Sequence, residues 1–507
     1  MKKIVFIFLT TICSIIFSNT NVSHSWCGIT ELQERDFDRF EYLYPQYMDS
    51  THYRVHFTTE PADSFFWNNA WMTHESTIEY AITVLEQAEF TYSVFENDGW
   101  EMPPLDCDDS ILDTNNPNHC NNYGGNSLYD IYIGLVQGPA ALVSPENSNN
   151  ELPYIGGLSS YILFANGLGL FGSMDDLASI NYYIVAHEIH HSIQFAYGPS
   201  FTGTPQNPIH QLWMFEQTAT FLENFIYPNS IHLRLLLSNC NIDTPLTHPE
   251  LGVYQSYAGA LWQIFLTDYL NNSNLIKYFW ESYGERINNG EIQITFFDIF
   301  NNQILEISND SLNLEDMYKE YAIWRYFTGE RAIPNQYFDE ANLYCSSSIL
   351  QIPDNSIQLQ SELGGNHYIE LPNENIYVNI QSENIISLPG ILINSDNENY
   401  ITFSDLELLE GNNIINVDSE FNGEHVLVLT SGYTANELNF ENINISFEID
   451  TNNNLGDINN DQIINVLDII LLVDSILLNE YQFIADLNND GFLNVIDVVL
   501  LINIILN

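Results

Sequence analysis

The sequence predicts a multidomain protein with a large, mainly α (α+β) domain, a β-sandwich and a small all-α module at the C-terminus. Three observations lead to this prediction. Apolar residues recur at helical spacing through much of residues 26–345, short alternating runs fill residues 350–450, and residues 456–507 contain an internal repeat. A chain of 507 residues also exceeds what one ordinary core can bury.

Residues 1–25 are predicted to be a signal peptide. Lys2 and Lys3 precede an apolar run at 4–17 that is too short to span a bilayer comfortably, and cleavage is expected after Ser18 or Ser25. The alternative is an uncleaved anchor. Because no second run of spanning length follows, we expect a mature chain without a transmembrane segment that is secreted, extracellular or at the cell surface.

The charge balance excludes some partners. The chain has 67 Asp+Glu but 11 Lys+Arg, a formal net charge of −56. Such a polyanion repels nucleic acids and anionic lipid surfaces, so we expect no nucleic-acid partner. It suits a protein that works in salt or binds hard cations.

The cysteines fit an exported protein. Five follow the signal peptide: Cys27, Cys107, Cys120, Cys240 and Cys345. Export permits disulfides, and the preferred pair is Cys107 with Cys120, which flank a polar loop. The odd count leaves one thiol free or outside this scheme, and the absence of C-x-x-C argues against a zinc site built on cysteines.

Residues 26–345 are expected to form the large domain. Alternation predicts strands at 51–57, 129–135 and 161–164. Helical periodicity predicts helices at 75–95, 174–197, 211–225 and 255–270, the second of which ends at Gly198-Pro199. Residues 350–450 carry turn signals about every ten residues, which indicates a β-sandwich, and residues 451–455 are a polar linker.

The helix at 174–197 contains the motif H-E-x-x-H. His187 and His191 lie four residues apart on one helix face and can bind one zinc ion, while Glu188 can act as the general base. A catalytic zinc needs a third protein ligand, which we expect to be Glu216 on the next helix. The metzincin pattern is excluded, because Gln194 and Tyr197 replace its glycine and third histidine.

Other interpretations of these residues remain open. The two histidines are core residues in the simplest alternative, and His190 is a competing ligand that we expect to be only a neighbour. Glu223 either orients a histidine or lies on a solvated helix face, and the solvated face is the preferred prediction. Candidate donors to a tetrahedral oxyanion are Tyr254, Tyr257 and His210.

The motif, together with Trp213-x-x-Glu216-x-x-Ala219-Thr220-x-x-Glu223 and Tyr227-Pro228, resembles the gluzincin branch of the zinc metallopeptidases. It is similar, more narrowly, to a group of secreted bacterial metalloproteases defined by the same motif. Tyr129-Asp130-Ile131-Tyr132 and Tyr257-Ala258-Gly259-Ala260-Leu261-Trp262 add to this resemblance, which covers roughly residues 50–345. It implies a zincin-like fold, one zinc ion at His187, His191 and Glu216, and Glu188 as base.

The tail repeat has the spacing of two calcium-binding loops of the EF-hand kind. Oxygen ligands are expected at loop positions 1, 3, 5, 9 and 12, with a backbone carbonyl at position 7. The first loop comprises Asp457, Asn459, Asp461, Ile463, Asn465 and Asp468; the second comprises Asp486, Asn488, Asp490, Phe492, Asn494 and Asp497. Gly491 occupies the turn position of the second loop, whereas Gln462 in the first is expected to weaken that site.

Two such loops, each followed by one apolar helix, resemble a type I dockerin. That resemblance implies two calcium ions, calcium-dependent folding and docking onto a cohesin-bearing scaffold. The segments 467–477 and 496–505 would supply the docking and core faces.

Together these features predict a secreted zinc-dependent endopeptidase that acts on a protein or peptide substrate and is docked through its C-terminal module. One alternative is a non-catalytic surface-binding or scaffold protein with a structural zinc helix. Another is a hydrolase of non-peptide bonds that the dockerin delivers for polysaccharide catabolism, although nothing in the metal motif favours sugars.

Overall fold

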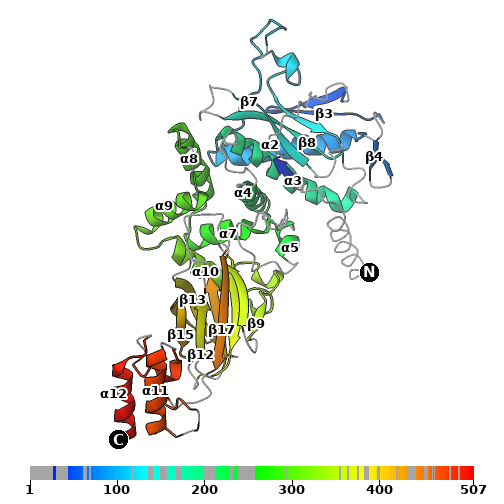
Figure 1. Cartoon of the computed structure of the whole chain (residues 1–507). Coiled ribbons are helices and arrows are strands. Elements are labelled where there is room, and N and C mark those ends of the chain that lie inside the picture. The colour runs from blue at the N-terminus through cyan, green and yellow to red at the C-terminus, as the bar shows by residue number, and fades with distance from the viewer. Residues whose placement is uncertain are drawn as a thin grey trace. The chain divides into compact units, whose positions relative to one another are not determined.

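The computed structural model describes residues 27–29, 44–60, 65–67, 70–72, 74–116, 119–134, 141–148, 157–166, 174–198, 212–228, 232–237, 257–291, 294–352, 356–361, 365–373, 376–381, 387–396, 400–417, 421, 423–430, 441–449, 455–459, 461, 463–478, 481–488 and 492–506. The chain divides into two compact units, residues 1–347 with 433–438, and residues 348–432 with 439–507. Figure 1 shows the helices and strands of each unit. The predicted signal peptide, His210, Tyr254, Gln462, Asp490 and Gly491 lie outside the described residues.

The first unit contains a six-stranded mixed sheet of order β1-β7-β8-β6-β3-β2. Strands β3, β6 and β8 run parallel, while β7 is antiparallel to β8 and β2 is antiparallel to β3. The bounds are β1 Cys27–Ile29, β2 Gln46–Asp49, β3 Tyr53–Phe57, β6 Tyr129–Ile133, β7 Ala141–Ser148 and β8 Leu158–Phe164, with a separate hairpin of β4 Phe65–Trp67 and β5 Ala70–Met72.

The helices of this unit are α2 Ile78–Asn97, α3 Met174–Ala196, α4 Leu212–Ile226, α5 His232–Leu237, α7 Ala260–Tyr269, α8 Leu275–Asn288, α9 Phe296–Ser308 and α10 Leu314–Tyr326. Short 3₁₀ turns occupy Cys120–Asn122, Gly329–Arg331 and Ala341–Leu343. Helix α3 packs against α2, α4 and strands β7 and β8, and α4 also packs against α7. The motif helix is therefore central to the unit (Figure 1).

The expectation of a mainly α domain understates its sheet. Strands β3, β6 and β8 lie where alternation predicts them, but β2 and β7 were not predicted. Strand β7 carries Pro145 and shifts register against β8 between Pro145 and Ser148. A proline and a bulge disrupt the alternating pattern by which strands are predicted, so strand β7 could not be predicted from that pattern.

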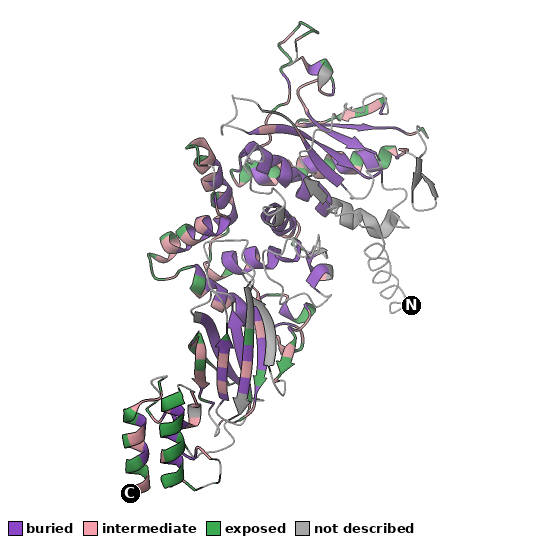
Figure 2. Ribbon diagram, viewed as in Figure 1, coloured by how far each residue is buried: buried purple, intermediate pink, exposed green. Residues whose placement is uncertain are grey.

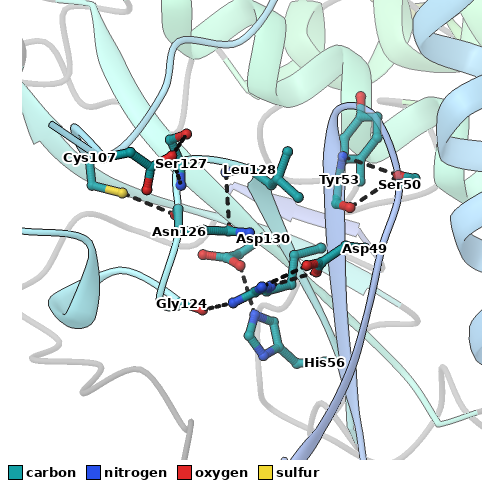
Figure 3. Close-up of polar contacts among 12 residues, drawn as sticks. Asp49, Ser50, Tyr53, His56, Cys107, Gly124, Asn126, Ser127, Leu128 and Asp130 are labelled. Atoms are coloured by element: carbon teal, nitrogen blue, oxygen red, sulfur yellow. Dashed lines mark hydrogen bonds and ion pairs between the residues drawn. The ribbon is translucent and has the colours of Figure 1, made fainter.

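A partly buried polar network lies at β3 and β6 (Figure 3). Arg54 donates two hydrogen bonds of 2.7 Å to Asp49 and one of 2.8 Å to the carbonyl of Gly124. The His56 Nε2 and Asp130 Oδ1 atoms are 2.7 Å apart, and both side chains are buried. The predicted Cys107–Cys120 disulfide is confirmed and closes the segment that precedes Gly124. Cys345 is also disulfide-bonded.

The second unit begins with the predicted β-sandwich. One sheet has the order β10-β17-β12-β15 and the other β14-β13-β16-β11-β9. The bounds are β9 Ile349–Gln351, β10 Ser356–Ser361, β11 Asn366–Leu371, β12 Ile376–Gln381, β13 Ser387–Ser395, β14 Ile401–Leu409, β15 Gly411–Ile415, β16 Glu424–Thr430 and β17 Glu441–Ile449.

The two sheets of the sandwich share one apolar core. Val378 and Ile380 on β12 contribute to it from the first sheet, and Leu427 and Leu429 on β16 contribute from the second. All four side chains are buried. A core that takes side chains from both sheets means that the sheets pack face to face, as in a β-sandwich.

The C-terminal segment of this unit contains two helices, α11 Val466–Leu478 and α12 Val495–Leu506, with a 3₁₀ turn at Phe483–Ala485 between them. The helices follow the two predicted calcium loops, as the repeat in the sequence requires. None of the helices in the described part of the chain has the length and apolar character needed to cross a membrane.

Candidate metal centre

The structure brings the three predicted zinc ligands together. His187 and His191 lie on α3 and Glu216 lies on α4, and all three side chains are buried. Ala219 and Thr220, one turn further along α4, are also fully buried, so small side chains line the contact between the helices. Figure 2 shows the described part of α4 as almost entirely buried.

The distances within this cluster fit one small cation. The His187 Nε2 atom lies 3.0 Å from both His191 Nε2 and Glu216 Oε2, and His191 Nε2 lies 3.4 Å from Glu216 Oε2. Zinc bonds of 2.0–2.1 Å in tetrahedral geometry place neighbouring ligand atoms about 3.3 Å apart. The three separations are therefore close to those of three corners of a zinc tetrahedron.

The hydrogen bonds outside the cluster determine which nitrogen of His187 faces inward. Its Nδ1 atom lies 2.6 Å from Glu223 Oε1, and a carboxylate oxygen accepts, so Nδ1 carries the hydrogen. The Nε2 atom thus faces Glu216 and His191, where it can bind either a proton or a metal ion. This contact is the usual arrangement by which a carboxylate orients a metal-binding histidine.

Charge in the cluster also calls for a cation. Burial alone would lower the pKa of His187, but its hydrogen bonds to Glu216 and Glu223 outweigh burial and raise that pKa to about 10. Burial alone would raise the pKa of Glu216, but the neighbouring charges of His191 and His187 lower it to about 2. Two buried carboxylates therefore need positive charge between them, which a proton or a divalent cation supplies.

Glu223 corrects the prediction of a solvated helix face. Its side chain is 2% exposed and contacts His187. Glu223 lies seven residues, or two helical turns, after Glu216, so both carboxylates project from the same face of α4 toward α3. That spacing was visible in the sequence and could have favoured the orienting role.

His190 is a neighbour of the cluster, as predicted, and not part of it. Its ring packs among Phe95, Trp100 and Trp280, with centroid distances of 5.9, 5.2 and 6.2 Å. Burial, with smaller effects of His191 and His187, lowers the pKa of His190 well below its ordinary value. His190 is therefore a neutral side chain in an aromatic pocket.

One predicted oxyanion donor lies near the cluster. The ring centroid of Tyr257 is 5.7 Å from that of His187, and Tyr257 is buried. The other two candidates lie outside the described residues. Glu188 is fully buried on α3 next to His187, where the motif predicts the general base. Sequence reasoning gave no supporting role to Gln194, whose Oε1 lies 2.7 Å from His191 Nδ1.

In both C-terminal loops, the aspartate at position 12 accepts hydrogen bonds from backbone N–H groups of the same loop. The position-12 carboxylate of the first loop, Asp468, accepts backbone N–H groups of Ile458 at 2.8 Å and Asn465 at 2.7 Å. In the second loop, Asp497 accepts from Leu487 and Asn494, both at 2.9 Å. The two copies of the predicted sequence repeat thus form loops with matching hydrogen bonds.

The remaining loop residues converge as the spacing predicts. The position-1 carboxylates, Asp457 and Asp486, are fully buried although they belong to polar loops. Asp461 donates its backbone N–H to Asp457 Oδ1 at 3.0 Å, and the Asn465 and Asn494 side chains contact the position-7 carbonyls of Ile463 and Phe492. Asn459 and Asn488 follow at position 3, each two residues after a buried aspartate.

The comparisons with known proteins bear on this segment. Residues 455–506 match the family model of the dockerin type I domain. This segment is a type I dockerin domain. Dockerin domains bind calcium, which explains why buried carboxylates are gathered in the two loops of this dockerin. No curated protein matches the chain.

The dockerin has a small core and extensive exposed apolar surface. Among its described residues, Leu472, Ala485 and Leu501 are fully buried apolar side chains. Figure 2 colours much of both helices as exposed. The exposed residues include many apolar ones, among them Val466, Leu467, Ile470, Leu477 and Leu478 on α11, and Val495, Ile496, Val499 and Leu506 on α12. Exposed apolar patches of this kind mark interaction surfaces.

Proposed function

We propose that this protein is a secreted zinc-dependent endopeptidase whose dockerin docks it onto a cohesin-bearing scaffold. The single observation that carries the enzymatic part is the cluster of His187, His191 and Glu216, whose ligand atoms lie 3.0–3.4 Å apart. Dockerin domains occur in extracellular and cell-surface proteins, which supports the location. The gluzincin resemblance of residues 50–345 stays a prediction and supplies the reaction class.

The residues present fit a zinc ion. They provide two imidazole nitrogens, from which zinc would displace any bound proton, and one carboxylate oxygen, a donor set that zinc prefers in catalytic sites. A zinc ion bound there would act as a Lewis acid and lower the pKa of a bound water. Glu223 holds His187 in the required tautomer, and Glu216 balances the positive charge.

Proton transfer is assigned to Glu188. It follows His187 directly, so its carboxylate starts from the same turn of α3 as the first ligand. A carboxylate in that position can take a proton from the attacking water and later give it to the leaving amine. Tyr257 is the described candidate for stabilising the oxyanion, because its ring lies beside His187.

The test compares the mature protein with Glu188→Gln for casein hydrolysis and for zinc content by mass spectrometry. Glu79→Gln, an exposed glutamate on α2, is the matched control. We expect zinc in all three proteins and hydrolysis in the parent and the control alone. Zinc in every protein with casein hydrolysis in none would contradict general endopeptidase activity and favour the non-catalytic scaffold.

A further inference from the structure

The second histidine of the motif has a neutral partner. His191 Nδ1 lies 2.7 Å from Gln194 Oε1, and Gln194 is fully buried one turn further along α3. His187, by contrast, has the carboxylate of Glu223 as its partner. The two imidazoles are therefore supported by chemically different groups.

The orientation of the Gln194 amide follows from its other contacts. Its Nε2 atom lies 3.1 Å from the backbone carbonyl of Phe215 and 2.9 Å from Thr218 Oγ1. A carbonyl oxygen can only accept, so the atom facing Phe215 is the NH₂ group and the atom facing His191 is the amide oxygen. That oxygen can only accept in turn, so His191 Nδ1 carries the hydrogen.

This assignment fixes the inner nitrogen of His191. With the hydrogen of Nδ1 held by Gln194, the Nε2 atom is the nitrogen that a metal would bind, and it faces Glu216 and His187 at 3.4 and 3.0 Å. Gln194 thus does for His191 what Glu223 does for His187. Both rings therefore direct Nε2, the nitrogen that a metal would bind, at the same centre.

The same amide also ties the two helices together. Thr218 donates its hydroxyl hydrogen to the carbonyl of Met214 at 2.8 Å, which leaves a lone pair to accept from Gln194. Phe215 and Thr218 flank Glu216 on α4. Gln194 therefore sets the distance between the helix that carries two ligands and the helix that carries the third.

A neutral partner also suits the charge of the site. Glu216 and Glu223 are two buried carboxylates that contact the histidines, and Glu188 is a third buried carboxylate on α3. A glutamate at 194 would leave an unbalanced buried charge and would face the carbonyl of Phe215 without a donor. An amide supplies both an acceptor and a donor without adding charge.

We infer that Gln194 is a positioning residue for the metal ligand His191 and sets its tautomer and its distance from Glu216. This inference rests on the proposed metal centre and not on peptidase activity. A positioning role of this kind typically accounts for about 10- to 100-fold in metal affinity.

The test measures zinc affinity of the full-length mature protein by chelator competition, in excess calcium so that the dockerin loops are saturated. It also records the visible absorption of the cobalt-substituted protein, which reports the ligand geometry. Gln194→Leu removes all three side-chain hydrogen bonds of Gln194, those to His191, Phe215 and Thr218. Gln263→Leu is the matched control, because Gln263 is another fully buried glutamine and contacts Gln217 rather than a ligand.

We expect Gln194→Leu to raise the zinc dissociation constant about 10- to 100-fold and to change the cobalt spectrum, while Gln263→Leu alters neither. Thr218→Val keeps the side-chain shape and removes the acceptor for Gln194, so a several-fold loss is expected even where Gln194→Leu folds poorly. Parent-like zinc affinity and cobalt spectra in both variants would overturn the inference. A parent that binds zinc without cleaving casein would contradict the peptidase proposal alone.

Discussion

Replacement of Glu223 by alanine tests the supporting contact of His187. The Glu223 Oε1 and His187 Nδ1 atoms are 2.6 Å apart, and the two side chains are only 2% and 0% exposed. The change leaves a buried N–H without its acceptor, which costs about 1–3 kcal/mol. Because His187 then loses the group that holds its metal-binding tautomer, we expect zinc affinity to fall about 10- to 100-fold, or about 1.4–2.7 kcal/mol.

The assay is chelator competition for zinc in excess calcium, with circular dichroism to establish that the variant is folded. Asn224→Ala is the control, since Asn224 is the next residue on α4 and is only half-buried. We expect parent-like zinc affinity in the control. A folded Glu223→Ala protein that binds zinc as tightly as the parent would refute the argument that this carboxylate orients His187.

Three further predictions concern stability and calcium. Gly124→Ala should destabilise the first unit by about 3 kcal/mol, because the new Cβ would lie 2.0 Å from the buried Asp130 carboxylate and the backbone has a left-handed φ of 74°. Gly290→Ala is the control: it has a φ of 80° but nothing within 4 Å of its Cβ, so it should cost only about 1–2 kcal/mol. Thermal denaturation of the two variants measures the difference. Burial and Asp339 raise the pKa of Asp268 from 3.8 to about 6, so ionisation of this carboxyl lowers the stability of the folded state as the pH rises through that range. Asp268→Asn should therefore raise the melting temperature at about pH 7 and have no such effect near pH 3. An equal effect at both pH values would contradict this argument. Asp468→Ala should reduce bound calcium from two ions to one by isothermal titration calorimetry, and retention of both would contradict the loop assignment.

Periodicity predicted the elements that carry the site, for physical reasons. Helix α3 is buried throughout residues 183–196 because it is packed against a sheet and two helices, and its predicted bounds of 174–197 agree with Met174–Ala196. The proposed ligand Glu216 was predicted as the third protein ligand that a catalytic zinc needs, supplied by a carboxylate on the helix after the motif. Those arguments depend on helical periodicity and on the spacing of the motif, both of which can be read directly from the sequence.

The contacts around the ligands could not be predicted in the same way. Whether Glu223 faces water or His187 depends on how α4 is rotated about its axis against α3, which helix packing decides. Gln194 is an ordinary residue in a helical pattern until Phe215 and Thr218 lie opposite it. The identity of such partners becomes visible only in the assembled fold.

The three histidines of the motif show how packing assigns roles to identical side chains. His187 and His191 each donate Nδ1–H to an acceptor and direct Nε2 toward Glu216. His190 lies between them in sequence, yet α3 turns it toward Phe95 and Trp100, where burial holds it neutral. The sequence offers three candidate ligands on one helix, and the acceptors on the opposite helix and one turn along α3 select two. A metal site of this kind is therefore specified as much by the groups that orient its ligands as by the ligands themselves.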